Sequence, residues 1–330
     1  MTPNNPIQNV VIIIKENHTF DNYFGTFPGA NGVTLPAAKN PPTSDHPHDH
    51  KAWLNRATSA VKLQYSQKDI PQYFSYAQQF TLCDNYFTEV ASQSEPNHIM
   101  LLAAASPVID DTSPSRSYQP KPPYDIPSLP AALQSAGLTW KVYANSTNYA
   151  SDIKALKGSK NIVRQAQFDK DVAAGTLSNV SWLYGTGSPT PTSEHPPQNV
   201  TVGAQWTADR ISLIAKSKYW ANTAIFVTWD DWGGWSDHVT PPLKDTWKGN
   251  GPTTGPAYKG SQFSYGPRVG CLVISPFSKR GVNHNFHSHV SLVKFCEKTF
   301  GLPPINARDA ASDDMTDCFD FTQTPLPPPP

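Results

Sequence analysis

The chain has 330 residues, and its 26 Lys and Arg balance 26 Asp and Glu, so the formal net charge is zero. Charged residues make up only 16% of the sequence, which gives the chain no electrostatic attraction to nucleic acid or to an anionic membrane surface. Neither nucleic acid binding nor integral membrane association is therefore expected. The hydrophobic fraction of 38% is enough for one large core and excludes disorder over most of the chain.

Short, nearly continuous apolar segments predict buried strands at 9–14, 138–143, 180–184, 224–229 and 269–275. Segments with a helical period alternate with them, at 70–80, 127–136, 207–215 and 290–300. This alternation predicts an α/β fold, a doubly wound, mostly parallel central sheet with helices on both faces. We expect residues 1–324 to form a single domain and residues 325–330 a proline-rich tail that is extended or disordered.

The remaining global features carry less information. The longest apolar runs are far shorter than the ~20 residues of a membrane span, and the polar N-terminus does not have the pattern of a signal peptide. The four cysteines are widely separated and form no C-x-x-C, so they suggest neither a zinc knuckle nor a redox pair. Their pairing stays open, and the sequence does not indicate an oligomeric state.

Acidic and amide side chains follow two of the predicted strands at the points where they end. Glu16 and Asn17 come after the first strand, and Asp230 and Asp231 come directly after the strand at 224–229. Ligands of open α/β sheets bind at the carboxyl ends of the strands, and two adjacent buried carboxylates are tolerated mainly when a cation lies between them. The sequence predicts a site for a hard cation there, with capped surface turns as the alternative.

A serine and several histidines offer groups for catalysis. Pro96 is typical of an early helix position, which places Ser94 at a helix N-terminus, where free backbone amides bind phosphate and stabilise an alkoxide. A serine at such a position is more often only a cap. Histidines crowd two loops around residues 46–50 and 284–289, and His195 lies in a third loop. They suit proton transfer, phosphoryl contacts or metal binding.

The segment 16–25, Glu-Asn-His-Thr-Phe-Asp-Asn-Tyr-Phe-Gly, resembles the opening motif of a bacterial phosphoesterase family. That family contains phospholipases C and certain acid phosphatases and belongs to the alkaline phosphatase superfamily. The resemblance continues through blocks spread over nearly the whole chain, at 47–50, 94–98, 194–197, 228–239, 268–281, 308–309 and 313–321. It implies an alkaline phosphatase-like fold, with residues 1–324 as the phosphoesterase catalytic domain.

The resemblance also implies roles for individual residues. The metal ligands would be Glu16, Asn17, Asp230 and Asp231, and Ser94 would be the nucleophile. The other catalytic residues would be His48, His195 and His238, and the substrate-binding residues Asn17, His98 and Asp237. The chain departs from the family pattern at three places: His18-Thr19 replaces the commoner Arg-Ser, Asp231 replaces Glu, and His98 replaces Arg. Of these, His98 is the departure that alters phosphate or head-group contacts.

The expected function is metal-dependent hydrolysis of phosphate esters through a phosphoserine intermediate, with a phosphomonoesterase of acid phosphatase type as the first hypothesis. The alternative is a phospholipase C that releases a phosphorylated head group, with Trp229, Trp232 and Trp235 lining a cleft rather than filling the core. A second alternative is a non-catalytic, metal-stabilised binding protein. The resemblance further implies a secreted or periplasmic location.

The expected cofactor is a divalent cation. Because the predicted ligands are all oxygen donors, Ca²⁺, Mg²⁺ or Mn²⁺ is favoured, and Zn²⁺ becomes a candidate if a histidine joins the site. The expected partner is a small phosphate ester or a phospholipid head group.

Overall fold

The computed structural model describes residues 5–117, 119–145, 149–188, 190–242 and 265–330. Within them, one mixed sheet has the strand order β4-β3-β5-β1-β6-β7-β2-β8, with β9 paired to β2. The strands are β1 (Asn9–Lys15), β2 (Thr81–Phe87), β3 (Trp140–Tyr143), β4 (Ile162–Val163), β5 (Val180–Tyr184), β6 (Thr223–Trp229), β7 (Arg268–Ile274), β8 (Gly281–Asn283) and β9 (His287–Ser288).

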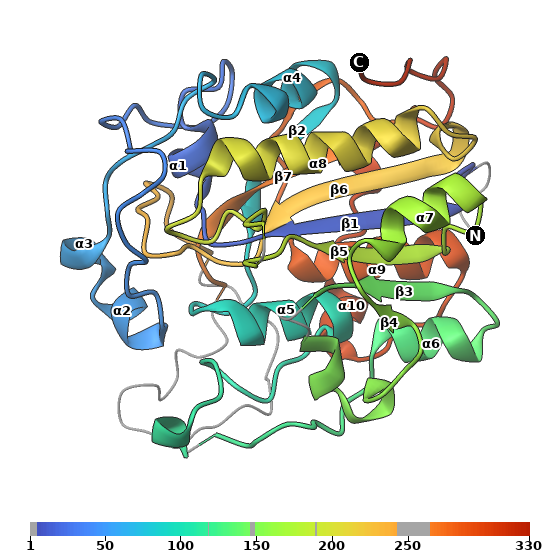
Figure 1. The fold of residues 1–330 in the computed structure, drawn as a ribbon, viewed down its shortest axis with the longest axis horizontal. Helices are drawn as coiled ribbons and strands as arrows, with labels where there is room; N and C mark the ends of the chain where they lie inside the picture. Colours follow the sequence, from blue (N-terminus) through green and yellow to red (C-terminus); the bar gives the residue numbers. More distant parts are fainter. Residues whose placement is uncertain (1–4, 118, 146–148, 189, 243–264) are drawn as a thin grey trace.

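Helices cover both faces of this sheet (Figure 1). The helices α4 and α8 lie on one face, with α7 packed against α8, and α5, α6, α9 and α10 lie on the other. The helices are α1 (Phe20–Phe24), α2 (His50–Leu54), α3 (Arg56–Ser59), α4 (Pro71–Gln79), α5 (Ser94–Ala103), α6 (Leu129–Ser135), α7 (Gln167–Ala174), α8 (Val200–Ala215), α9 (His289–Phe300) and α10 (Ala307–Ala311). The predicted α/β fold with a mostly parallel central sheet is confirmed.

The centre of the sheet explains why its strands are apolar throughout. Strand β1 pairs in parallel with β5 on one side and with β6 on the other, and every residue of these three strands is buried. Strands covered on both faces need no polar alternation. Strand β7 is also buried but runs antiparallel to both of its neighbours, β6 and β2, whereas beyond it β2 pairs in parallel with β8 and β9.

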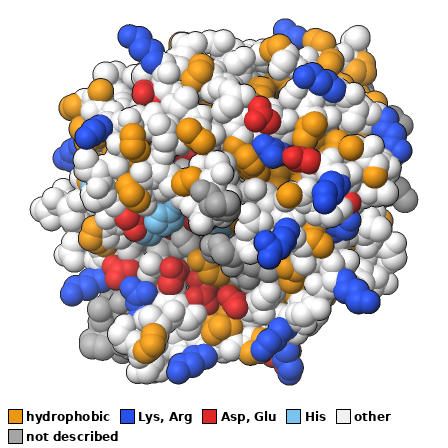
Figure 2. Space-filling view, in the orientation of Figure 1, with side chains coloured by type: hydrophobic (Ala, Val, Ile, Leu, Met, Phe, Trp, Pro, Cys, Tyr) orange, Lys and Arg blue, Asp and Glu red, His pale blue; other side chains and the backbone are white. Residues whose placement is uncertain are grey.

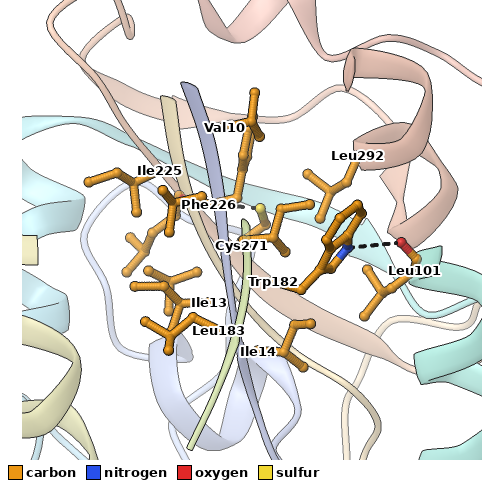
Figure 3. Packing of buried hydrophobic residues seen from close by; sticks show 14 of the residues in the cluster. Val10, Ile13, Ile14, Leu101, Trp182, Leu183, Ile225, Phe226, Cys271 and Leu292 are labelled. Carbon is orange, nitrogen blue, oxygen red and sulfur yellow. Dashed lines mark hydrogen bonds between the residues drawn. The ribbon is translucent and has the colours of Figure 1, made fainter. Parts of the chain in front are cut away.

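The core on the α5 side connects the sheet to the helix that carries Ser94. Figure 3 shows Trp182 of β5 beside Leu101 of α5, with the indole Nε1 donating to the Leu101 carbonyl oxygen at 3.3 Å. All ten residues of α5 are buried. Because the helix is enclosed along its whole length, its N-terminus has a fixed position relative to the ends of the strands.

The structure adds detail at the start of α8 and in the C-terminal tail. Helix α8 begins at residue 200, seven residues before the predicted start, where the Asn199 side chain caps it by accepting from the backbone N–H groups of Thr201 and Val202. At the other end of the chain, the Leu326 backbone N–H donates to the Pro276 carbonyl oxygen at 2.7 Å. No helix among the described residues combines the length and apolar character that a bilayer crossing requires.

Candidate active site

The two acidic segments meet at one edge of the sheet. Strands β1 and β6 are parallel neighbours, so the residues that follow them leave the sheet side by side. The Asn17 backbone N–H donates to Asp230 Oδ1 at 2.8 Å, and the Asp230 backbone N–H donates to the Lys15 carbonyl oxygen at 2.9 Å. The expected proximity of residues 16–17 and 230–231 therefore follows from strand pairing alone.

Asn17 has an unusual backbone conformation and an unpaired amide oxygen. Its φ is 67°, in the left-handed region that non-glycine residues rarely adopt. The side chain is fully buried, its Nδ2 lies 3.2 Å from His48 Nε2, and its Oδ1 has no hydrogen-bond partner among the described residues. An orphaned buried oxygen indicates a missing partner at this point.

The loop after Asp231 approaches Asn17 closely enough to require glycine. Gly233 has a φ of +55°, and a Cβ on it would lie 2.3 Å from the Asn17 carbonyl oxygen. No side chain fits there. The glycine therefore keeps the two segments in contact.

Ser94 is the first residue of α5, as predicted, and it faces the second aspartate. Its Oγ donates to Asp231 Oδ2 at 3.2 Å. Both Asp230 and Asp231 are fully buried. Burial, and after it the negative charge of Asp230, raise the pKa of Asp231 well above its ordinary value, so this pair of carboxylates lacks sufficient positive charge nearby.

His98 supplies part of the compensating charge. Its Nε2 lies 3.1 Å from Asp230 Oδ2 and 3.6 Å from Glu16 Oε1, and its ring stacks on Tyr149 at 4.7 Å. Burial lowers the pKa of His98, but the two carboxylates outweigh it and raise the pKa to about 10. His98 thereby also keeps the pKa of Asp230 well below its ordinary value, against the effect of burial.

A polar cavity of about 410 Å³ opens in front of these groups. Among the residues that line it are Glu16, Ser94, His48 and His195. The two histidine rings are 6.3 Å apart, and each Nδ1 lies within 2.7 Å of a backbone carbonyl oxygen. In each histidine this hydrogen bond keeps a proton on Nδ1, so that Nε2 is the atom that can accept or donate a second proton. Figure 2 shows histidine at the surface of this face with acidic side chains gathered beside it.

The surroundings of His195 favour its charged form. Burial lowers the pKa of His195, but the Glu16 carboxylate and the hydrogen bond to the Pro196 carbonyl oxygen raise it above the ordinary value. A histidine in this state can donate a proton to a leaving group.

Sequence analysis did not identify two residues that line the same cavity, Asp111 and Tyr149. Burial, with the Glu95 carboxylate adding to it, raises the pKa of Asp111 to about 6. The signal for Asp111 was its place in the long loop at 106–125, since such loops lie at the ligand-binding side of the sheet. Nothing in the sequence marked Tyr149, which reaches the cavity by stacking on His98.

Of the predicted site residues, Glu16, His48, Ser94 and His195 line the Ser94 cavity; Asn17, His98 and Asp231 each contact one of these four, and Asp230 contacts Asn17 and His98. Asp237 and His238 lie apart from this group. Asp237 pairs with Arg268 at 3.0 Å, and the same arginine binds Asp21, which also contacts His238 Nδ1 at 2.7 Å. These four residues form a separate ion-pair cluster. Asp237 and His238 instead line a second, more apolar cavity of about 610 Å³ together with the indoles of Trp232 and Trp235.

Comparison with known proteins decides the family. Residues 7–45 and 39–303 match the model of the Phosphoesterase family. The chain belongs to the Phosphoesterase family. The family predicted from the motifs at 16–25 and further along the chain is thus confirmed.

Curated members of the family resemble the chain over almost all of its length. It is 28% identical to the non-hemolytic phospholipase C of Pseudomonas aeruginosa, over 96% of this chain and 57% of that protein. It is 29% identical to phospholipase C A of Mycobacterium tuberculosis, over 97% of this chain and 78% of the relative. The chain therefore spans little more than half of the Pseudomonas protein and about four fifths of the mycobacterial one.

Solved structures share the fold at much lower identity. The lipoteichoic acid synthase LtaP of Listeria monocytogenes matches with a TM-score of 0.52 and 10% identity, over 98% of this chain and 76% of that chain. Murine ectonucleotide pyrophosphatase/phosphodiesterase 5 matches with a TM-score of 0.53 and 10% identity, over 95% of this chain and 100% of that chain. At this identity the likeness concerns the fold alone.

The residues of this Phosphoesterase member fit the divalent metal that the family implies. The orphaned Asn17 Oδ1 and the raised pKa of Asp231 both indicate a missing positive partner. Carboxylate, amide and hydroxyl oxygens make up most of the donor set, which suits a hard cation. Glu16, His98 and Asp230 also converge closely enough to share an ion, and a histidine ligand would extend the choice to zinc.

A buried ion pair supports the site from behind. Lys15 and Glu194 are fully buried and 3.2 Å apart, and they lie next in sequence to Glu16 and His195. Glu194 also accepts from the hydroxyls of Tyr23 and Tyr73 and from the indole of Trp229. Trp229 is thus part of this buried network.

Replacing Glu194 by Gln is expected to lower the free energy of unfolding by about 3–5 kcal/mol, because the buried Lys15 amine loses its charged partner. Urea unfolding followed by circular dichroism measures the change. The double variant Lys15→Met Glu194→Gln removes both charges and should lose less stability than Glu194→Gln alone. Equal stability of the wild type and Glu194→Gln would show that the pair contributes nothing.

Proposed function

We propose that the chain hydrolyses phosphate esters, with Ser94 as the nucleophile. The observation that carries the proposal is the position of Ser94. Its hydroxyl lies at the N-terminus of a ten-residue buried helix, 3.2 Å from a buried aspartate and at the wall of a polar cavity. The positive end of the helix dipole favours the negative charge of a phosphoryl group beside that hydroxyl, while the Glu95 backbone N–H of the same turn donates to Asp111 Oδ1 at 2.7 Å.

In this proposal Glu16, Asn17, Asp230 and Asp231 hold the divalent cation. When bound, the cation neutralises charge on the phosphoryl oxygens and lowers the pKa of the attacking hydroxyl. Asp231 orients Ser94 by accepting its hydrogen bond. His98 balances the charge of Asp230 and stacks on Tyr149, which lines the cavity, and we retain His98 as a substrate-binding residue.

The reaction proceeds in two displacements. The Ser94 hydroxyl gives its proton to Asp231 as Oγ attacks phosphorus, the bond from phosphorus to the alcohol oxygen breaks, and His195 or His48 donates a proton to that oxygen. The product of this step is a phosphoserine, which for a diester substrate still carries the head group. Water then attacks phosphorus from the opposite side and gives a proton to the same histidine, and the Ser94 oxygen leaves and takes its proton back from Asp231.

For the substrate we propose a phosphodiester of the phospholipid class. The relatives that match over most of this chain are named phospholipases C, which supports this alternative over the phosphomonoesterase hypothesis. We also retain the proposal of an exported location, which the resemblance implies. Hydrolysis of para-nitrophenyl phosphorylcholine without hydrolysis of para-nitrophenyl phosphate is the expected result, and the reverse pattern would restore the monoester hypothesis.

His195 and His238 were both predicted to be catalytic, but their surroundings differ. Comparing their alanine variants tests which of them donates a proton to the leaving group. His195→Ala is expected to lower kcat about 10²- to 10⁴-fold, because only His48, whose Nε2 lies 3.2 Å from Asn17 Nδ2, would remain at the cavity to donate the proton. His238→Ala should leave kcat close to the wild-type value, since its imidazole contacts Asp21 and Asn31 rather than the Ser94 cavity. Steady-state kinetics on the diester compare them. A larger loss for His238→Ala than for His195→Ala would contradict the assignment.

A further inference from the structure

A second group of metal-ligating side chains lies away from the candidate active site. Cys83 of β2, His287 of β9 and Cys318 at the end of the short 3₁₀ helix Thr316–Cys318 are all buried, each with at most 1% of its surface exposed. One ligand atom from each lies within 4.8 Å of the others. All four cysteines of the chain are free, and the family motifs assign no role to these three residues.

The distances match a tetrahedral metal. Cys83 Sγ and Cys318 Sγ are 3.7 Å apart, and Cys318 Sγ is 3.8 Å from His287 Nε2. Metal–sulfur bonds of about 2.3 Å and metal–nitrogen bonds of about 2.0 Å, at tetrahedral angles, separate two sulfurs by about 3.8 Å and a sulfur from a nitrogen by about 3.5 Å. Asp317 Oδ2 lies 3.4 Å from His287 Nε2 but does not join the group that the two sulfurs form with this imidazole, so the cluster offers three protein ligands.

Residues behind the proposed ligands orient them by hydrogen bonds, as is usual in zinc sites. Asp313 Oδ2 lies 2.6 Å from His287 Nδ1, which fixes the proton there and turns Nε2 towards the sulfurs. Asp313 itself accepts from the Met315 backbone N–H and the Ser291 hydroxyl. A carboxylate behind the ligating histidine is a regular feature of zinc sites.

The side-chain amide of Asn283 is a second group that supports the proposed ligands. Its Nδ2 lies 3.2 Å from Cys318 Sγ and 2.8 Å from Asp317 Oδ2. Donation to the sulfur stabilises its anionic, metal-ligating form. Asp313 and Asn283 thus support His287 and Cys318 from outside the cluster.

We propose that Cys83, His287 and Cys318 bind one zinc ion, with a water molecule as the fourth ligand. Two thiolates and an imidazole form a borderline-soft set that favours zinc over Ca²⁺ or Mg²⁺. The ion fastens the C-terminal segment to β2 and β9. It also braces the turn into α9, where His289 Nε2 lies 2.9 Å from the Asp230 carbonyl oxygen.

Cobalt substitution tests the proposal separately from the active site. Co²⁺ bound by thiolates gives an intense charge-transfer absorption, which a set without sulfur such as that around Ser94 does not give. We expect this absorption to saturate at one cobalt per chain in the wild type and in Cys296→Ser, and to be lost in Cys83→Ser and Cys318→Ser. Cys296 is the matched control, because it is also buried and free but lies outside the cluster.

A measurement on the unmodified chain keeps the test independent of whether the cysteine variants fold. Titrating the thiols of the zinc-loaded protein with a mercurial should release one zinc per chain to a coloured indicator. Asp313→Asn, which leaves every ligand in place, should weaken zinc binding about 10- to 100-fold. Absence of the cobalt charge-transfer band, absence of zinc release, or a Cys83–Cys318 disulfide in non-reduced peptides would each overturn the proposal.

Discussion

Replacing Ser94 by Ala is expected to lower kcat/KM for the phosphodiester by at least about 10⁴-fold, with the fold intact. The loss is large because the variant has no oxygen to form the bond to phosphorus, so the two-step route is closed. The change removes one atom at the wall of the cavity and no contact within the core. Circular dichroism and the thermal transition should therefore stay close to those of the wild type.

Ser193→Ala is the matched control for this experiment. Ser193 lines the same cavity, but its hydroxyl donates to the side chain of Gln198 rather than to Asp231. Hydrolysis by Ser94→Ala at the wild-type rate would exclude this residue as nucleophile. A wild-type chain that binds divalent cations but hydrolyses neither ester would favour the non-catalytic binding protein.

Removal of divalent cations is expected to abolish hydrolysis. Asp230→Asn is expected to weaken the affinity for the activating cation by more than about 100-fold, which exceeds the usual effect of replacing a residue that only contacts a metal ligand. The physical reason is the charge of the site, since Asp230 and Asp231 are fully buried side by side and Asp231 lacks compensation. Titrating Ca²⁺, Mg²⁺, Mn²⁺ and Zn²⁺ into chelated protein, with diester hydrolysis as the readout, measures the affinity for each.

Asp237→Asn is the comparison for Asp230→Asn. Asp237 is a buried aspartate of the same sequence block, but its partner is Arg268. This variant should lose stability and keep its affinity for the activating cation. Full activity after exhaustive chelation would remove the cation from the mechanism, and equal affinities of Asp230→Asn and wild type would remove Asp230 from its ligands.

Most of the central sheet could be predicted from the sequence because burial on both faces leaves a continuous apolar signal. Strand β2 was missed because Asp84 and Asn85 interrupt its pattern, at the point where its pairing with β7 shifts register. Strands β8 and β9 have only three and two residues, too few for any periodicity. Their existence depends on the neighbouring strand rather than on their own composition.

The site residues that directly follow a strand could be predicted from the sequence. Those whose position depends on a later turn of the chain could not. Residues 16–17 and 230–231 lie together because β1 and β6 are parallel neighbours. Asp237 is only six residues beyond Asp231, yet the turn at Gly233 and Gly234, both with positive φ, directs it towards Arg268 instead. The cysteine and histidine cluster has no spacing pattern at all, since its members come from three distant segments.

The backbone at residue 17 has a consequence for engineering. An asparagine with a φ of 67° holds the chain in a conformation that disfavours folding by about 1 kcal/mol, whereas glycine adopts it freely. Asn17→Gly would therefore relax the end of β1 while deleting the unpaired amide oxygen. At this position a substitution that raises the stability of the fold would remove a group that the site uses. A thermostabilised version of the enzyme should therefore keep Asn17.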